Sequence, residues 1–389
     1  MRRKADQAPD APAAPAAAAP AAAGPTAAGP TAAGPTAAGP TAAGPTAAGA
    51  AAVARPTLRD VAMLAGVSAK TASRVINAEP GVSPSKVDAV RRAIAQLNYR
   101  PNFTASSLRR SNGRTATIAA VLEDLANPFS SALHRALEDV ARGREVIIVA
   151  GSVDEDPDRE RALVRAFTMR QADGLVIVPA SDNQAYLTRE VHGATPVVFV
   201  DRPPVGLQAD AVLVDNQAGA AEAVHHLVAS GHRAIGYLGD LRTIATARQR
   251  FQGYKEALSD NGIRPVPAHI AHDLHTSAAT ADATRRLLAT DPPPTALFAA
   301  QNLVTIGAIR ALRDLGLHER VALVGFDDFP LADLLQPAVT VVAQDPFTMG
   351  HLAAELIFRR LDGESWEPTT HLVPTRLIAR GSGEIPPHG

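Results

Sequence analysis

Cysteine is missing from the 389-residue sequence, and so is any long apolar run. Without thiols the chain has no disulfide, no thiolate metal ligand and no cysteine nucleophile. No segment approaches the roughly 18 apolar residues that a membrane span requires. The basic start at residues 1–4 is followed by Asp6, Asp10 and several prolines, which leave no apolar core for a signal peptide. We therefore expect a soluble, cytoplasmic protein without a membrane partner.

The first 54 residues have a low-complexity sequence. Residues 5–54 are almost wholly alanine, proline and glycine, and five tandem copies of Gly-Pro-Thr-Ala-Ala begin at Gly24. Frequent proline blocks helix formation, and alanine side chains bury too little area to offset the entropy of ordering. We predict a disordered tail over residues 1–54.

Charge is distributed unevenly along the chain. Residues 55–115 hold 11 lysines and arginines against 3 acidic residues, a balance of +8, and the first 54 residues contribute +1. Because the whole chain sums to −1, the remainder carries −10. A compact basic module on an acidic body favours an anionic partner for one end, and nucleic acid is the usual one. A solvated basic face is the alternative.

Helical patterns follow in quick succession between residues 55 and 100. The first begins at a capping pair, Thr57 and Asp60. The second runs from Ser68 to Asn77. The third opens with Ser83 and Pro84, and its apolar residues recur at helical spacing: Val87, Val90, Ile94 and Leu97. Three short helices with a shared apolar seam predict a small all-α domain over residues 55–100.

From residue 116 onward the pattern changes to short apolar runs that alternate with longer amphipathic segments. This alternation predicts parallel sheets in a doubly wound α/β body. The remaining length of about 275 residues favours two lobes over residues 116–389. The predicted strands are 117–122, 145–150, 174–178, 196–200, 234–238, 296–299 and 321–325, with helices near Ser130, Arg159, Gly219, Ala247, Ala278, Thr305 and Met349.

Specific motifs occur throughout both parts. The helical part contains TLRDVA at 57–62, AGVS at 65–68, SRVIN at 73–77 and LNYRPN at 97–102. The body contains NPF at 127–129, ADGL at 172–175, DRP at 201–203, GHR at 231–233 and GFDD at 325–328. Together these motifs resemble the lactose repressor (LacI/GalR) family of transcription regulators. The resemblance covers residues 55–382 and implies a helix-turn-helix headpiece joined to a two-lobed body like that of periplasmic binding proteins.

In the resembled family the second headpiece helix enters the major groove of DNA. Ala69, Lys70 and Arg74 match positions at the base edges there. Lys70 and Arg74 carry donors suited to guanine O6 and N7, whereas Ala69 offers only an apolar contact. Three further positions are implied to hold phosphates: Thr71, Ser73 and Asn77.

Residues 101–115 match the family's hinge helix and linker. A helix of this length is marginal alone, and in the family it orders when two subunits meet on DNA. The resemblance implies that Leu108 inserts into the minor groove at the operator centre and that Arg109 adds phosphate attraction. The alternative is that Leu108 is a buried residue of the linker. The C-terminus shows no leucine heptads, so we expect a homodimer on a near-palindromic operator.

The resemblance also implies an effector cleft between the two lobes. Carboxylates and a guanidinium in one cleft suit a polyhydroxylated ligand, a sugar or sugar derivative, whose binding would release the repressor from its operator. Two departures from the family pattern, Gln301-Asn302 in place of Asn-Asp and His275 in place of an aromatic residue, leave the ligand class open. The cleft candidates are Asn127, Phe129, Ser130, Asp201, Arg202, Thr246, Arg248, Arg250, His275, Gln301 and Asp327, with Asp201 and Arg202 expected at a crossover between lobes.

Other classes of function have less support. The chain lacks the glycine-rich nucleotide loops and the nucleophile elbow, so we expect no catalytic site and no cofactor. Adjacent His225 and His226 would point about 100° apart on a helix, so we expect no metal site. A solute-binding protein would fit the body alone, but the basic headpiece and the missing export signal oppose it. The alternative of an effector that strengthens DNA binding, in place of one that releases the protein, stays open.

Overall fold

The structure is a computed structural model that describes residues 56–77, 79–100, 114–191 and 195–388. The predicted tail and the predictions for Leu108 and Arg109 lie outside these residues. Among the described residues, no helix is long and apolar enough to cross a membrane.

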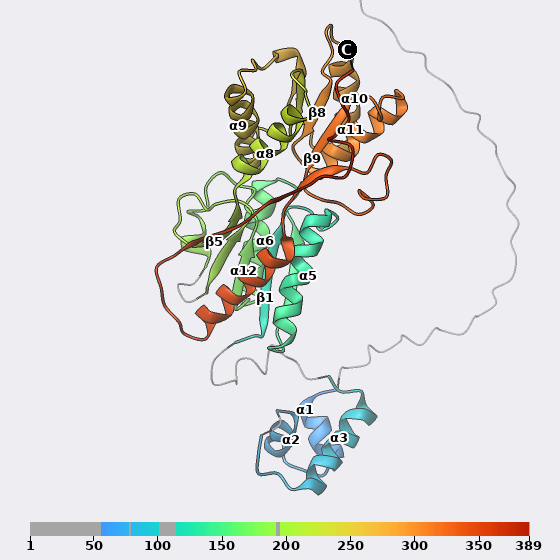
Figure 1. The fold of residues 1–389 in the computed structure, drawn as a ribbon. Helices are drawn as coiled ribbons and strands as arrows, with labels where there is room; N and C mark the ends of the chain where they lie inside the picture. The colour runs from blue at the N-terminus through green and yellow to red at the C-terminus, as the bar shows by residue number, and fades with distance from the viewer. Residues whose placement is uncertain (1–55, 78, 101–113, 192–194, 389) are drawn as a thin grey trace, which may run out of the picture.

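The headpiece is a bundle of three helices, as the sequence predicts (Figure 1). The capping box before the first helix is confirmed, because the Thr57 amide donates to Asp60 Oδ2 at 2.7 Å and the Asp60 amide donates to Thr57 Oγ1 at 3.4 Å. Ser68 Oγ accepts from the Thr71 amide at 3.1 Å and starts the second helix. Val61, Ala62, Ala72, Val90 and Ala93 form the buried seam. The helices are α1 (Leu58–Leu64), α2 (Ala69–Ile76) and α3 (Pro84–Leu97).

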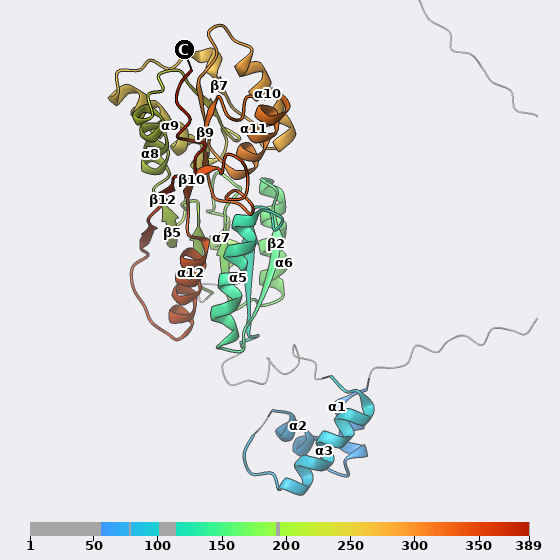
Figure 2. The same cartoon turned by 45° about the vertical axis from the view of Figure 1, so that its right-hand side comes forward.

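The first lobe is a six-stranded parallel sheet covered on both faces. Helices α5 and α12 pack side by side on one face, and α6 covers the other (Figure 2). The sheet order is β11-β5-β4-β3-β1-β2. Its elements are β1 (Thr117–Leu122), α5 (Pro128–Arg142), β2 (Ile147–Ser152), α6 (Pro157–Met169), β3 (Gly174–Ile177), α7 (Leu187–Glu190), β4 (Val197–Val200), β5 (Asp210–Val214), α12 (Pro346–Leu361) and β11 (Thr370–Val373).

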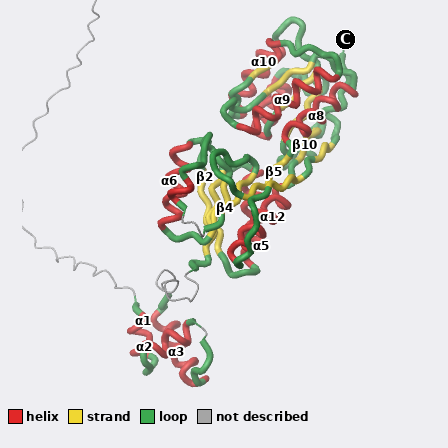
Figure 3. Tube along the Cα trace, turned by 90° about the vertical axis from the view of Figure 1, so that its left-hand side faces the viewer, coloured by secondary structure: helices red, strands yellow, loops and turns green. Residues whose placement is uncertain are grey.

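The second lobe repeats this architecture, with sheet order β12-β10-β9-β8-β6-β7 between two helix pairs (Figure 3). All its strand pairs are parallel except β10 with β12. Its elements are α8 (Asn216–Ala229), β6 (Ile235–Leu238), α9 (Ala245–Asp260), a 3₁₀ turn (Pro267–His269), β7 (Ile270–Ala271), α10 (Ser277–Leu288), β8 (Ala296–Ala299), α11 (Asn302–Asp314), β9 (Ala322–Phe326), β10 (Thr340–Ala343) and β12 (Arg376–Ile378).

The chain crosses between the lobes three times: from β5 to α8, from β10 to α12 and from β11 to β12. The expectation that Asp201 and Arg202 lie at a crossover is therefore wrong. These two residues follow β4, and the chain returns to the same sheet as β5 before it leaves at Asp215 and Asn216. Residues that follow strands of both sheets, Glu123 after β1, Asp240 after β6 and Asp327 after β9, meet between the lobes.

Candidate functional site

The outer surface of α2 is the first candidate site. Ser68 caps the helix, so Ala69 and Lys70 lie in its first turn, and both are exposed. Lys70 forms no ion pair within the described residues. Thr71 and Ser73 are half-buried and Asn77 is exposed at the helix end, while Ala72 faces the bundle core with no exposure. The structure therefore leaves the implied base-contacting turn of α2 open to a partner.

Arg74, another implied base-contacting residue, is engaged within the headpiece. Its Nη2 donates to the carbonyl oxygen of Pro80, and its Nε lies 3.4 Å from Glu79 Oε2. Both partners belong to the turn between α2 and α3. These contacts occupy Nη2 and Nε of Arg74, whereas Lys70 forms no hydrogen bond or ion pair within the described residues.

A cleft between the two lobes is the second candidate site. Its residues follow the carboxyl ends of strands or start helices, which is where ligands bind in parallel α/β sheets. The central space measures about 40 Å³, room for about one water molecule at roughly 30 Å³ each in the liquid. A cavity of about 260 Å³ adjoins it at Arg202 and Ile244. A further cavity of about 350 Å³ adjoins it at Phe129, Asp327 and Gln344.

Most of the predicted cleft residues line this central space. Eight of the eleven do so: Asn127, Phe129, Asp201, Arg202, Thr246, Arg250, Gln301 and Asp327. Ser130 is buried within α5 and lies outside the lining. Arg248 is exposed and donates through Nη1 to the carbonyl oxygens of Arg242 and Thr243. His275 reaches the cleft only through its partner Asp240.

Arg250 is the most highly connected side chain of the cleft. It is 4% exposed and its guanidinium lies 3.8 Å from the ring centre of Phe326. Its Nε donates to Asn216 Oδ1 at 2.8 Å, and its Nη1 donates to the carbonyl oxygen of Ala300 at 2.8 Å and to Asp327 Oδ2 at 3.2 Å. One residue thus joins α9, the start of α8 and the loops after β8 and β9.

Arg202 is paired within the first lobe. Its Nη1 and Nη2 donate to the two carboxylate oxygens of Glu155 at 2.7 and 2.6 Å, a bidentate pair. Its Nε is buried without a hydrogen bond and lies 3.7 Å from Asp201 Oδ2. Burial raises the pKa of the Asp201 carboxyl above its usual value. Burial thus disfavours the ionised form of Asp201, and hydrogen-bond donors of a ligand would stabilise that form.

Two acidic residues of the cleft were not predicted from the sequence. Glu123 follows β1 and accepts one hydrogen bond, from Asn127 Nδ2 at 3.2 Å. Burial, with repulsion from Glu155, raises the pKa of Glu123 to about 7. Asp240 follows β6 and accepts from His275 Nδ1 at 2.9 Å. A signal for both existed, because each comes within two residues of the end of a predicted strand.

A hydrogen bond across the cleft joins the two lobes. Asn302 Nδ2, at the start of α11, donates to Asn127 Oδ1 at 2.9 Å, and Asn127 caps α5 of the first lobe. Asn302 is 1% exposed, and its own Oδ1 is buried without a hydrogen bond. The central space alone is too small for a sugar, so a ligand of that size must also use the adjoining cavities or move the lobes that this bond joins.

His275 should make stability depend on pH. Its hydrogen bond to Asp240, opposed by burial and aided by the charges of Glu123 and Glu155, raises its pKa from 6.5 to about 8. A raised pKa gives stability that is fully present below pH 6.5 and lost as pH rises through about 8. We expect His275→Gln to lower the free energy of unfolding by about 1 kcal/mol below that window and to match wild type above it. Denaturant unfolding at several pH values measures this, and an equal loss at every pH would contradict it.

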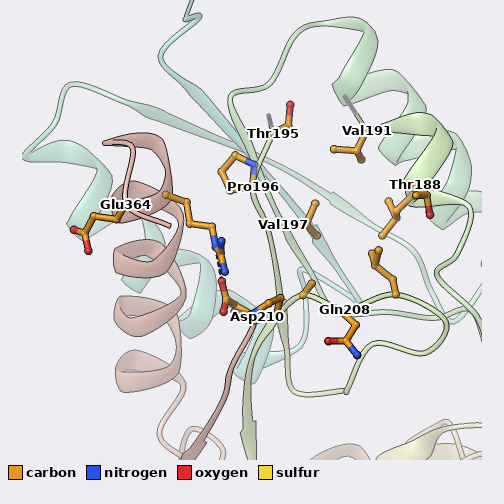
Figure 4. Close-up of a pocket in the computed structure, with 13 residues that line it drawn as sticks. Thr188, Val191, Thr195, Pro196, Val197, Gln208, Asp210 and Glu364 are labelled. Atoms are coloured by element: carbon orange, nitrogen blue, oxygen red, sulfur yellow. Dashed lines mark hydrogen bonds and ion pairs between the residues drawn. The ribbon is translucent and has the colours of Figure 1, made fainter. Parts of the chain in front are cut away.

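A cavity of about 440 Å³ lies in the first lobe, between β4, β5, α7 and the end of α12 (Figure 4). Its buried carboxylate, Asp210, accepts from Arg360 Nε at 2.7 Å, Trp366 Nε1 at 3.0 Å and the Thr369 amide at 2.9 Å. These donors hold the chain after α12 against β5. We assign this carboxylate to the folding of the lobe. No group of three residues suited to hold a metal ion occurs within the described ranges.

The fold and the two sites define a class of protein: a small helix-turn-helix module attached to a two-lobed ligand-binding body. Comparisons with known proteins agree. Residues 57–102 match the family described as "Bacterial regulatory proteins, lacI family", and residues 224–383 match a "Periplasmic binding protein-like domain".

The alignments with similar proteins cover nearly the whole length of those proteins. The HTH-type transcriptional regulator CelR of Thermobifida fusca is 33% identical over 343 residues, which span 85% of this chain and 98% of that protein. A CelR–cellobiose complex is 31% identical over 84% of this chain and all of the other, with a TM-score of 0.62. The Lac repressor dimer bound to operator and the anti-inducer ONPF is 26% identical, covers 84% of this chain and 99% of the other, and has a TM-score of 0.74. The chain belongs to the LacI family and is a transcription regulator.

Proposed function

We propose that this regulator is a cytoplasmic repressor that binds a near-palindromic operator as a homodimer and is released by a carbohydrate bound between its lobes. The observation that carries the proposal is the combination of an open first turn of α2, with Lys70 exposed, and a polar interlobe cleft. The Lac repressor structure, a dimer on operator DNA, and the CelR–cellobiose complex support the two halves.

The proposed effector residues are those that line the central space. Arg250 and Asp327 present a paired guanidinium and carboxylate, and Asp201 adds a carboxylate that accepts no hydrogen bond within the described residues. Such groups bind the adjacent hydroxyls of a sugar in pairs. Phe129 supplies an apolar surface for a sugar face. The geometry supports these roles, and mutation of each residue tests them.

Ligand entry is coupled to the arrangement of the lobes. The Asn302–Asn127 hydrogen bond holds the cleft closed around a space too small for a sugar. A ligand that separates these groups then determines the angle between the lobes through its own contacts. Coupling of this kind is typically ~1–3 kcal/mol, a change of roughly 5- to 150-fold in operator affinity.

The DNA half of the proposal is tested by selecting duplexes from a random pool with the purified full-length protein at near-physiological salt. We expect enrichment of a near-palindromic sequence, because two α2 helices in a symmetric dimer read two related half-sites. Light scattering on the same sample measures the mass of the complex. An enriched sequence without two related halves, bound by one copy of the chain, would contradict the homodimer.

A further inference from the structure

The nitrogen donors of the central cleft are largely used within the protein. Arg202 Nη1 and Nη2 are bound to Glu155, and Arg250 Nε and Nη1 are bound to Asn216, Asp327 and a carbonyl oxygen. The cleft's one buried nitrogen without a hydrogen bond, among the described residues, is Arg202 Nε. Arg250 Nη2 makes no hydrogen bond within the described residues and is not fully buried, so it is the guanidinium donor that a ligand's acceptor can reach. The other guanidinium donors of the cleft are mostly committed.

Several hydrogen-bond acceptors in and beside the cleft, in contrast, have few or no donors within the described residues. Asp201 is 9% exposed, lines the cleft and accepts no hydrogen bond within the described residues. Glu123 has a single amide donor, from Asn127. Gln344 Oε1 and Asn302 Oδ1 are both buried without a hydrogen bond. Buried polar atoms in native proteins are normally paired, so these oxygens indicate a partner that donates hydrogen bonds.

The formal charge of the cleft points the same way. Glu123, Glu155, Asp201, Asp240 and Asp327 contribute five carboxylates, against the two guanidiniums of Arg202 and Arg250 and the imidazole of His275. Glu155, Asp240 and Asp327 each have a cationic partner within hydrogen-bond distance. The charges of Glu123 and Asp201 are the surplus. Arg248 is exposed and lines the adjoining cavity of about 260 Å³ and not the central space, where Glu123 and Asp201 lie.

We propose that Glu123 and Asp201 select the effector by its charge. The cleft takes a neutral or amine-bearing polyol, which donates hydrogen bonds to these two carboxylates, and it rejects phosphorylated or carboxylated sugars. An anion would face two like charges in a space where Arg202 and Arg250 are already paired, and juxtaposed like charges are strongly unfavourable when water is excluded. This inference rests on the proposed effector site between the lobes.

The test compares neutral sugars with amine-bearing and anionic derivatives. Three mixtures are added to the full-length protein at about pH 8, where Glu123 is ionised. One contains glucose, galactose and ribose, another glucosamine and galactosamine, and a third glucose 6-phosphate, ribose 5-phosphate and glucuronate. The thermal unfolding midpoint is recorded, and any active mixture is resolved by calorimetry. We expect the neutral or amine mixture to raise the midpoint, and the phosphate form of the bound sugar to bind at least about tenfold more weakly.

Variants separate the inference from the site on which it rests. In a Glu123→Gln/Asp201→Asn double variant, discrimination against the phosphate should fall to about threefold or less, whereas Glu222→Gln, the same change on the exposed face of α8, should preserve it. An anionic sugar that binds wild type as tightly as its neutral parent, and is displaced by Ala247→Leu in the cleft wall, would overturn the charge selection alone. A ligand whose binding Ala247→Leu leaves unchanged would overturn the proposed effector site instead.

A ligand-free measurement decides the case in which no mixture binds. The pKa of Glu123 is raised from 4.5 to about 7, so the wild-type protein loses stability as pH rises through that interval. Glu123→Gln removes this loss. The unfolding midpoint of the variant should gain on that of wild type between pH 4.5 and 7 and stay above it at higher pH. A difference in unfolding midpoint that stays constant with pH, or a variant midpoint that falls relative to wild type as pH rises, would show that the charge of Glu123 is compensated within the protein. Either result would overturn the proposal.

Discussion

Arg250→Ala should lower the free energy of unfolding of the full-length protein by about 3–5 kcal/mol. The substitution leaves the buried Asp327 carboxylate without its cationic partner, and removing one member of a buried ion pair typically costs that much. Asn216 Oδ1 and the carbonyl oxygen of Ala300 lose a donor as well. Urea unfolding followed by circular dichroism measures the change. The structure thus gives Arg250 a part in folding in addition to its proposed contact with the effector.

Arg248→Ala is the matched control, because Arg248 lies two residues away on α9 but is exposed and donates only to carbonyl oxygens of the preceding loop. We expect its effect to stay below about 1 kcal/mol. Similar losses in the two variants would mean that the buried network contributes no more than an ordinary surface arginine. Arg250→Lys should recover part of the lost free energy of unfolding. It restores a positive charge, but it lacks the guanidinium that reaches both Asn216 and Asp327.

Lys70→Ala should weaken binding to the selected operator by about 1–3 kcal/mol, or roughly 5- to 150-fold. Lys70 lies exposed in the first turn of α2 without an ion pair in the described residues, so we expect it to reach a base edge without giving up an internal contact. Fluorescence anisotropy with operator and with unrelated duplex measures both affinities. The loss should be several times larger on operator, because a base contact depends on sequence and a phosphate contact does not.

Lys86→Ala provides the comparison within the headpiece. Lys86 is exposed in the first turn of α3, outside the proposed recognition helix. Its removal should change the affinity for operator and for unrelated duplex by similar, small amounts. If Lys70→Ala behaves like Lys86→Ala, Lys70 binds phosphate and the bases are read by other residues, with Arg74 the next candidate once its contacts to Glu79 and Pro80 are released.

The sequence predicts the fold well where a segment's own pattern is decisive. The helix caps at Thr57 and Ser68 are local, and seven strands appear as apolar runs because both faces of a parallel sheet are buried. The strands not predicted are β5, β7, β10, β11 and β12, and of these β11 and β12 pair with strands that lie far away along the chain. β5 starts at the charged Asp210, which is satisfied by Arg360, and β12 is three residues of partly exposed chain at a sheet edge.

The cleft shows the same division. Asn127, Asp201 and Asp327 were predicted because they lie in motifs that resemble the family pattern, and the structure brings them to one space. Glu123 and Asp240 lie outside those motifs, and their position depends on the meeting of two sheets. Asn302 belongs to the Gln301-Asn302 pair that departs from the family pattern, and this departure was visible in the sequence. Its hydrogen bond to Asn127, however, requires the second lobe to lie against the first. Burial and pKa values follow from that arrangement alone.

The central claim is that a ligand in the interlobe cleft controls DNA binding. Its most direct test is the anisotropy of labelled operator bound to the full-length protein as the neutral and amine-bearing sugars are added, with wild type and Ala247→Leu compared side by side. We predict that the sugars release operator from wild type at concentrations at which the variant, whose larger side chain occupies the central space, stays bound. Equal release from both proteins would contradict the claim, because the sugar would then act from outside the cleft.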